Sequence, residues 1–145
     1  MLNIEMRFKK THPDAVTPQY AHDCDSGMDL YTLRDYVIPP LTAVKIETGI
    51  AFELPDGFEM QIRLRSGLGV TCPLVMASGI GTVDNGYRGP VFIPVRNVAY
   101  YDVIIHKGMR LAQAVLCPVY RATLVEAREL SRTARGEGGF GSTGE

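Results

Sequence analysis

Val44-Lys-Ile-Glu-Thr-Gly-Ile-Ala-Phe-Glu-Leu54 carries the clearest structural signal in the chain, because residues suited to a protein interior occupy every second position. Lys45, Glu47 and Glu53 lie between them. Successive side chains of a β-strand point to opposite faces of the sheet, so this alternation predicts a strand with one face against a core. An amphipathic helix would instead need apolar residues three and four positions apart.

The same alternation recurs in three shorter stretches, residues 4–8, 60–65 and 91–95. Turn-forming residues separate the stretches: Pro39-Pro40, Pro55-Asp-Gly57, Asn85-Gly86 and Lys107-Gly108. We expect Asn85-Gly86 at the tip of a β-hairpin, in the type I′ turn that this dipeptide prefers. Residues 66–76 are the one candidate for a short helix, although their glycines are poor helix formers. Many short strands joined by regular turns predict an all-β sandwich, jelly roll or barrel.

Composition describes an ordinary globular chain of 145 residues, enough for one domain. A net charge of −1 gives no electrostatic reason to expect a nucleic acid or a membrane as a partner. No apolar run approaches the ~18 residues that span a bilayer, and the N-terminus lacks the apolar segment of a signal peptide. Cys24, Cys72 and Cys117 are odd in number and widely spaced, so we expect free thiols in a reducing compartment, the cytoplasm.

The segment Arg135-Gly-Glu-Gly-Gly-Phe-Gly-Ser-Thr-Gly144 combines five glycines with an arginine, an aromatic ring and two adjacent hydroxyls. Glycine-rich turns present backbone N–H groups to anions, and arginine binds phosphate through two parallel hydrogen bonds. These properties predict a strap that closes over a phosphorylated ligand bearing a ring; a frayed chain end is the alternative. The segment is not a phosphate-binding P-loop, because Ser142 holds the position of the essential lysine.

Two other places carry residues with a possible chemical role. Arg65 ends an alternating stretch and precedes Ser66-Gly67, which together offer a guanidinium, a hydroxyl and N–H donors to a phosphate. A solvated strand face followed by an ordinary turn is the alternative. Asp84 and Tyr87 flank the Asn85-Gly86 turn, and Asp84 can equally belong to the turn chemistry.

Five segments follow one another in an order that is more specific than any of them alone. They are residues 25–30, 65–67, 81–89, 108–113 and 135–144. In this order and spacing they resemble the five motifs of the homotrimeric dUTPases, the deoxyuridine triphosphate nucleotidohydrolases. The resemblance covers the chain from about Tyr20 to Gly144. Met109 departs from the family pattern, which usually has an acidic residue before the arginine.

The resemblance implies a fold, an assembly and a reaction. The fold is all-β, a dUTPase-like jelly-roll β-barrel with one short helix in residues 1–134, followed by a flexible glycine-rich C-terminal arm in residues 135–145. The chains form a homotrimer whose active sites are shared between subunits. The reaction is Mg²⁺-assisted attack of water on the α-phosphorus of dUTP. It yields dUMP and pyrophosphate, limits uracil incorporation into DNA and supplies dUMP for thymidylate synthesis.

The resemblance also implies a role for individual residues. Asp84 would orient and deprotonate the attacking water, Tyr87 would pack on the deoxyribose, and Asp29 would hold Mg²⁺ through its water shell. The backbone of residues 79–83 would read the edge of the uracil and exclude the methyl group of thymine, while Phe140 would stack on the ring. The remaining substrate-binding residues that it implies are Arg65, Ser66, Gly67, Ser78, Gly81, Val83, Gln113, Arg135, Gly141, Ser142 and Thr143.

Two other functions stay open at this point. A dCTP deaminase or a bifunctional deaminase–dUTPase has the same fold, but deamination calls for an additional acid/base carboxylate beside the base, and no further motif supplies one. A regulatory protein that binds dUTP as a signal would need the same pocket without turnover, which Asp84 argues against. The expected location is the cytoplasm, or the nucleus if a eukaryotic host or virus encodes the chain.

Overall fold

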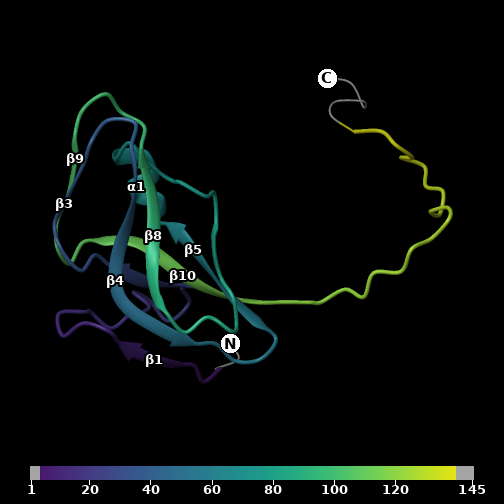
Figure 1. The fold of residues 1–145 in the computed structure, drawn as a ribbon, viewed down its shortest axis with the longest axis horizontal. Coiled ribbons are helices and arrows are strands. Elements are labelled where there is room, and N and C mark those ends of the chain that lie inside the picture. Colours follow the sequence, from purple (N-terminus) through teal and green to yellow (C-terminus); the bar gives the residue numbers. More distant parts are fainter. Residues whose placement is uncertain (1–3, 140–145) are drawn as a thin grey trace.

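The computed structural model describes residues 4–139, and the statements below about the structure concern these residues. They form ten strands and one short helix, drawn in Figure 1. The helix is α1 (Ser66–Thr71), and the strands are β1 (Arg7–Lys10), β2 (Gly27–Tyr31), β3 (Tyr36–Ile38), β4 (Ala43–Glu53), β5 (Phe58–Leu64), β6 (Leu74–Met76), β7 (Gly81–Val83), β8 (Pro90–Asn97), β9 (Val103–Ile105) and β10 (Arg110–Pro118). The predicted all-β jelly-roll class with one short helix is confirmed.

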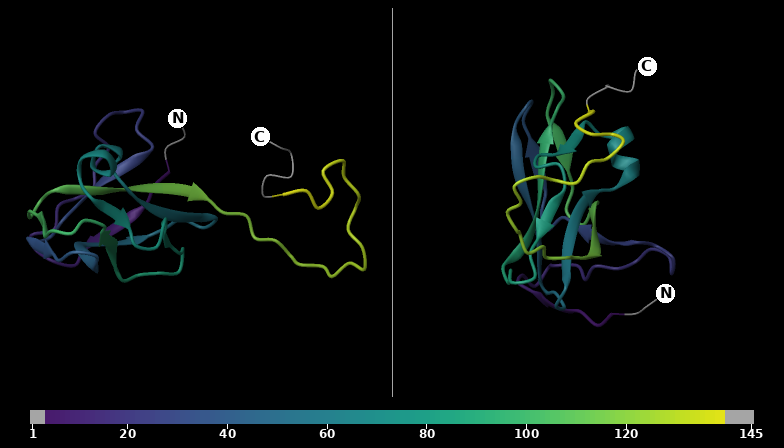
Figure 2. Two further views of the ribbon diagram at one scale, coloured as in Figure 1. Left: turned by 90° about the horizontal axis from the view of Figure 1, so that it is seen from above. Right: turned by 90° about the vertical axis from the view of Figure 1, so that its right-hand side faces the viewer.

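Two four-stranded antiparallel sheets enclose the core. One has the strand order β1-β4-β8-β6 and the other β2-β10-β5-β7, while β3 pairs with β9 in a separate two-stranded sheet. In Figure 1 β4 and β8 run side by side, and Figure 2 gives two further views of the same arrangement. From β4 to β8 successive strands alternate between the two large sheets. Segments distant in sequence are therefore neighbours within each sheet.

Alternate residues of both sheets form one hydrophobic core. Ile46 in β4 and Ile93 in β8 are fully buried on the inner face of one sheet. Met60 and Ile62 in β5 are equally buried on the inner face of the other. Their neighbours along each strand point away from the core, which is the pattern that the alternating sequence predicts. Burial of each such side chain stabilises the fold by about 1.5–3 kcal/mol, so these strands hold the two sheets together.

A bulge interrupts the pairing of β4 with β8. The register against β8 shifts between Glu47 and Ala51. Thr48 faces inward there, as the alternation predicts, and its hydroxyl donates a hydrogen bond of 2.7 Å to a carbonyl of β8. Gly49 has a φ of +69°, a conformation that glycine adopts without strain. A Cβ at Gly49 would lie 2.8 Å from the Cβ of Ala15, so the glycine lets the N-terminal segment pack closely on the strand.

The Asn85-Gly86 turn differs from the prediction. The strands on either side of it belong to different sheets, since β7 pairs with β5 while β8 pairs with β4 and β6. Neither residue has the positive φ that a type I′ turn requires at both central positions. The turn carries the chain from one sheet to the other, so the strand twist that favours type I′ turns within a hairpin does not act on it. The predicted hairpin is therefore wrong.

The helix is shorter than predicted. It ends at Thr71, and Leu74–Met76, which the prediction included in the helix, instead form β6 and pair with β8. Two glycines in the first two turns weaken the helix, while the β8 edge offers the following residues ladder hydrogen bonds. No helix in the described part of the chain is long and apolar enough to cross a membrane.

Beyond β10 the chain leaves the body of the protein. Residues 119–139 contain no helix or strand and run away from the sheets in Figures 1 and 2; we call them the extended segment. At its start the N–H of Val119 donates a hydrogen bond of 2.8 Å to the carbonyl of Gly57. The predicted boundary between residues 134 and 135 falls inside this segment and stays a prediction.

We expect Gly49→Ala to lower the free energy of unfolding more than Gly57→Ala. Both glycines have positive φ angles, +69° and +80°, which cost other residues about 1–2 kcal/mol. Only at Gly49 would the new methyl group also meet neighbours, because nothing lies within 4 Å of a Cβ at Gly57. Equilibrium unfolding in urea at one protein concentration compares the two variants. Equal losses would mean that the N-terminal segment does not pack tightly against β4.

Candidate active site

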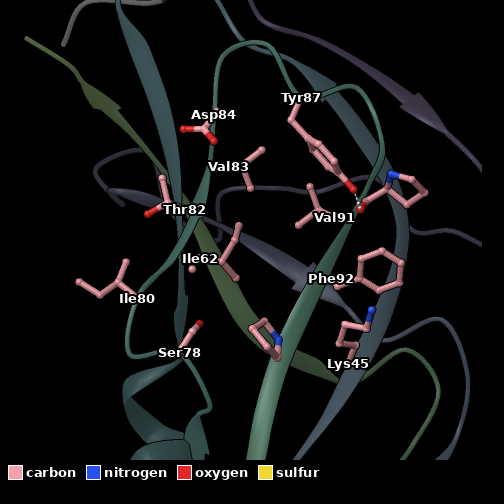
Figure 3. Close-up of a pocket in the computed structure, with 13 residues that line it drawn as sticks. Lys45, Ile62, Ser78, Ile80, Thr82, Val83, Asp84, Tyr87, Val91 and Phe92 are labelled. Atoms are coloured by element: carbon pink, nitrogen blue, oxygen red, sulfur yellow. Dashed lines mark hydrogen bonds between the residues drawn. The ribbon is translucent and has the colours of Figure 1, made fainter. Parts of the chain in front are cut away.

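A cavity of about 480 Å³ lies between β7 and β8, within the size range of pockets that hold small ligands. We call it the base cavity, and Figure 3 shows the residues around it. Five predicted substrate residues line it: Ser78, Gly81, Val83, Asp84 and Tyr87. The other lining residues are Lys45, Ile62, Ile80, Thr82, Pro90, Val91, Phe92 and Pro94. The structure thus brings together the residues predicted to contact the base, the sugar and the attacking water.

β7 forms one wall of the base cavity and offers it a strand edge. It pairs with β5 through three residue pairs and is the last strand of its sheet. The edge away from β5 has no ladder partner among the described residues, so its N–H and C=O groups can bind a ligand. A Cβ at Gly81 would lie 3.1 Å from the Cβ of Ile62. Glycine therefore lets the strand approach the apolar floor of the cavity closely.

Asp84 and Tyr87 occupy the two ends of one tight turn. Asp84 is the first residue after β7, and its carbonyl accepts a hydrogen bond of 3.0 Å from the N–H of Tyr87. The Tyr87 hydroxyl donates to the carbonyl of Pro90 at 3.0 Å, which holds the ring along the cavity wall in Figure 3. A Cβ at Gly89 would overlap the Tyr87 hydroxyl, so glycine leaves the space that the ring needs. The exposed Asp84 carboxylate accepts no hydrogen bond from any described residue and is available to a water molecule.

A second group of predicted residues surrounds Asp29, whose side chain is 9% exposed. One of its carboxylate oxygens forms an ion pair with Nε of Arg65 at 3.0 Å, and the other accepts a hydrogen bond from Nη1 of Arg110 at 3.1 Å. Gln113 stands opposite Asp29 in the ladder between β2 and β10. Its side chain covers Gly27, where a Cβ would overlap the amide oxygen. We call Asp29, Arg65, Arg110 and Gln113 the two-arginine cluster.

The two-arginine cluster carries one positive charge in excess. Asp29 compensates one guanidinium, while the side chains of Arg65 and Arg110 remain 35% and 48% exposed. Arg65 also precedes α1, whose first residues, Ser66 and Gly67, have backbone N–H groups that the helix itself cannot pair. Guanidinium groups and unpaired N–H groups are the donors that bind phosphate in proteins. The cluster is therefore suited to an anionic group.

The base cavity and the two-arginine cluster are separate in the single chain. None of the cluster residues, nor Ser66 or Gly67, lines the base cavity among the residues that the structure describes. The cluster joins β2, β10 and the end of β5, whereas the cavity lies beyond β7, the strand at the sheet edge. Arg135, in the extended segment, donates a local hydrogen bond from Nε to the carbonyl of Gly138 at 2.9 Å. Four predicted residues, Phe140, Gly141, Ser142 and Thr143, lie outside the described residues.

Several residues at these sites were not assigned a role from the sequence, among them two with polar or aromatic side chains at the base cavity and one arginine of the cluster. Lys45 and Phe92 line the base cavity, with Nζ of Lys45 5.4 Å from the centroid of the Phe92 ring. Their outward positions in alternating strands predicted only that they face away from the core. Arg110 belongs to a recognised motif, but its partner Asp29 is distant in sequence, and no local pattern indicates the pairing.

Mg²⁺ fits this site as an ion carried by the substrate. In residues 4–139 no group of three or more His, Cys, Asp or Glu side chains could enclose a metal. Both oxygens of Asp29 already contact arginines, but each has a further lone pair that can accept from a metal-bound water. Mg²⁺ usually keeps several of its waters and binds through one or two carboxylates and substrate phosphates. A water-mediated contact is therefore the form of Mg²⁺ binding that these donors allow.

The fold and the two sites define an all-β protein with a pocket for a small ring and a separate site for an anion. The family model for dUTPase matches residues 13–144. The chain is 46% identical to the deoxyuridine 5′-triphosphate nucleotidohydrolase of Hydrogenobaculum sp. (strain Y04AAS1), over 97% of this chain and 99% of the relative. It is 42% identical to the protein of that name from Clostridium tetani over the full length of both. The chain belongs to the dUTPase family.

A solved structure supports the same assignment. The dUTPase of Staphylococcus bacteriophage 80alpha, in a structure with dUPNHPP, superposes with a TM-score of 0.92 and 26% sequence identity. The match covers 99% of this chain and all of the phage chain. The fold is therefore shared over the whole length, including the strands that form both sites.

We expect Asp29→Asn to lower the free energy of unfolding by about 1–3 kcal/mol, because the neutral amide removes the negative charge that pairs with both guanidinium groups. The loss stays in this range since both arginines can still reach water. Asp102→Asn, at an exposed carboxylate, is the control and should change little. Urea unfolding measures both variants. If Asp29→Asn is as stable as the control, the arginines do not depend on the carboxylate.

Proposed function

We propose that the protein hydrolyses dUTP to dUMP and pyrophosphate, through attack of water on the α-phosphorus. The observation that carries the proposal is the base cavity, which combines a free strand edge, an aromatic ring and the unpartnered carboxylate of Asp84. Membership of the dUTPase family and the shared name of the relatives support the same reaction.

The edge of β7 selects the base. Its backbone N–H and C=O groups are fixed in position by the ladder to β5 and can pair with the edge of a uracil ring. Ser78, Gly81 and Val83 contribute to this wall. The close packing of Gly81 on Ile62 makes the wall stiff, so that a 5-methyl group meets backbone rather than a movable side chain. Thymine is therefore excluded sterically, and cytosine by its different donors and acceptors.

Asp84 is the general base, and Tyr87 selects the sugar. The carboxylate accepts a proton from the attacking water and aligns it with the phosphorus, a role that typically accelerates a reaction about 10²–10⁴-fold. The Tyr87 ring packs against the deoxyribose and leaves no room for a 2′-hydroxyl. Both residues come from one turn, so the sugar and the attacking water are positioned together.

The triphosphate binds the cationic donors. Arg65, Ser66, Gly67 and Gln113 supply a guanidinium, a hydroxyl, backbone N–H groups and an amide, and Asp29 holds Arg65 in place while contacting the metal through water. When bound, Mg²⁺ neutralises part of the phosphate charge. Phosphoryl chemistry needs mainly alignment and charge neutralisation from the protein, so no covalent nucleophile is required.

A homotrimer with shared active sites accounts for the separation of the two groups of residues. The base cavity of one subunit would face the two-arginine cluster of another. The extended segment supports this, because Leu124, Val125 and Leu130 are 93%, 84% and 88% exposed in the single chain and gain from being covered by a second copy. The remainder of the arm then closes the site, with Phe140 on the uracil and with Arg135, Ser142 and Thr143 on the terminal phosphate.

The alternatives fit the base cavity less well. A deaminase needs a further acid/base carboxylate beside the base, and Asp84 is the one acidic residue among the described residues that line the cavity. A purely regulatory binding protein would not need an unpartnered carboxylate at the rim. Residues 4–139 contain three cysteines and no disulfide, which suits the reducing cytoplasm as the location.

With Mg²⁺ present, we expect the purified protein to release pyrophosphate from dUTP at least about 100-fold faster than from dTTP, dCTP or UTP, because each competitor conflicts with a fixed part of the pocket. Product identification by chromatography distinguishes the alternatives. Ammonia release from dCTP would indicate a deaminase, and tight binding of dUTP without pyrophosphate release would indicate a regulatory protein.

We expect Asp84→Asn to lower kcat about 10²–10⁴-fold with little change in affinity for a non-hydrolysable dUTP analogue, since the amide keeps the shape but cannot take a proton. Asp56→Asn, at an exposed carboxylate in the neighbouring turn, is the matched control. Steady-state kinetics and calorimetry provide the two readouts. Substantial turnover by Asp84→Asn would refute its role as general base.

A further inference from the structure

One side chain ties the turn that carries Asp84 to the body of the protein. Nδ2 of Asn85 donates hydrogen bonds to the carbonyl oxygens of Leu54 and Pro55, at 2.9 and 2.8 Å. These carbonyls lie just beyond the end of β4, which belongs to the opposite sheet from β7. The half-buried Asn85 side chain therefore joins the end of one sheet to the end of the other.

The other hydrogen bonds of this turn stay within it or reach only the first residue of β8. The N–H of Tyr87 donates to the carbonyl of Asp84, and the Tyr87 hydroxyl donates to a carbonyl three residues further on. Nη1 of Arg88 donates to the carbonyls of Asn85 and Tyr87. These bonds shape the turn and tie its end to Pro90, the first residue of β8. In the part of the chain that the structure describes, Asn85 makes the only side-chain hydrogen bonds from residues 84–89 to the connection between β4 and β5.

The turn lies between two open spaces, so little packing surrounds the Asp84 side chain. A second cavity of about 570 Å³ lies behind it, opposite the base cavity, and Asp84 lines both. The other residues around the second cavity are Asp56, Gly57, Phe58, Glu59, Asn85, Gly86, Val119 and Arg121. The ladder that holds β7 ends at Val83, one residue before Asp84. Between that point and Pro90, where the ladder of β8 with β4 begins, Asn85 supplies the side-chain hydrogen bonds that hold the turn to the connection after β4.

We propose that Asn85 is a positioning residue for the reaction: its amide fixes the turn and thereby places the Asp84 carboxylate against the attacking water. The inference rests on the proposed function, in which Asp84 is the general base. Asparagine suits the task because its NH₂ group supplies two donors to two neighbouring carbonyls, whereas an ionised aspartate can only accept. A displacement of about 1 Å at a catalytic group can reduce the rate about 100-fold, so the two hydrogen bonds have a large effect on turnover.

The test compares Asn85→Ala and Asn85→Asp with Gly86→Ala. Gly86 is a matched control in the same turn, because its φ is not positive and a Cβ there would meet nothing within 4 Å. We expect kcat for dUTP to fall about 10–100-fold in Asn85→Ala, and at least as far in Asn85→Asp, whose carboxylate faces two carbonyl oxygens. KM should change less than kcat, and Gly86→Ala should stay within about twofold of the wild type.

Amide hydrogen exchange supplies a second readout. Peptides that cover residues 84–88 should exchange faster in both Asn85 variants and not in Gly86→Ala, while the core strands stay protected. A purely structural role would lower the melting temperature of the Asn85 variants and leave kcat unchanged. That result, or unchanged exchange at the turn together with kcat within twofold of the wild type, would overturn the inference.

Asp84→Asn separates the failure of this inference from failure of the proposed function. If Asp84→Asn is inactive while Asn85→Ala retains the wild-type kcat, the general base stands and only the role of Asn85 is refuted. If Asp84→Asn retains its turnover, the general-base assignment fails, and the inference about Asn85 fails with it.

Discussion

The short ladder between β5 and β7 is the interaction on which the candidate active site depends. Its three residue pairs hold a strand that would have no stable position alone, and they end at Val83, so that Asp84 is the first residue beyond the sheet. Because Gly81 lies close to the buried Ile62, β7 packs directly against the core and has little freedom to move. The opposite edge of β7 stays available for a ligand. One strand thus provides both the proposed recognition edge and the starting point of the turn that carries Asp84.

Charge is organised separately from base recognition. The base cavity is mostly apolar and has one carboxylate at its rim, whereas the guanidinium groups gather around Asp29 on the other side of β5. This separation keeps the proposed base away from arginines that would form an ion pair with it in the absence of substrate. The turn around Pro55 supports both the Asp84 turn, through Asn85, and the start of the extended segment, through the carbonyl of Gly57. The turn that carries Asp84 and the extended segment are therefore held by the same connection between β4 and β5.

Local patterns predicted the strands well and the connections between them less well. The alternation in residues 44–54, 60–65 and 91–95 corresponds to β4, β5 and β8, because the side-chain period depends only on the backbone. The Asn85-Gly86 hairpin and the helical assignment of residues 74–76 were wrong. Both errors concern which strand pairs with which, and that depends on residues far away in the chain. The grouping of Asp84 with Tyr87 followed from their proximity in sequence, whereas the contact of Arg110 with Asp29 did not.

The sequence by itself determined the all-β class, the faces of the main strands and, through the order of five motifs, membership of the dUTPase family. These depend on local periodicity and on residue identity, which a sequence displays directly. Only the tertiary structure decided that β7 and β8 lie in different sheets, that one carboxylate contacts two arginines, and that Asn85 bonds to the carbonyls just after β4. These facts depend on the pairing of distant segments around a common core. That pairing is set by the packing of the whole chain and is not encoded in any one stretch of it.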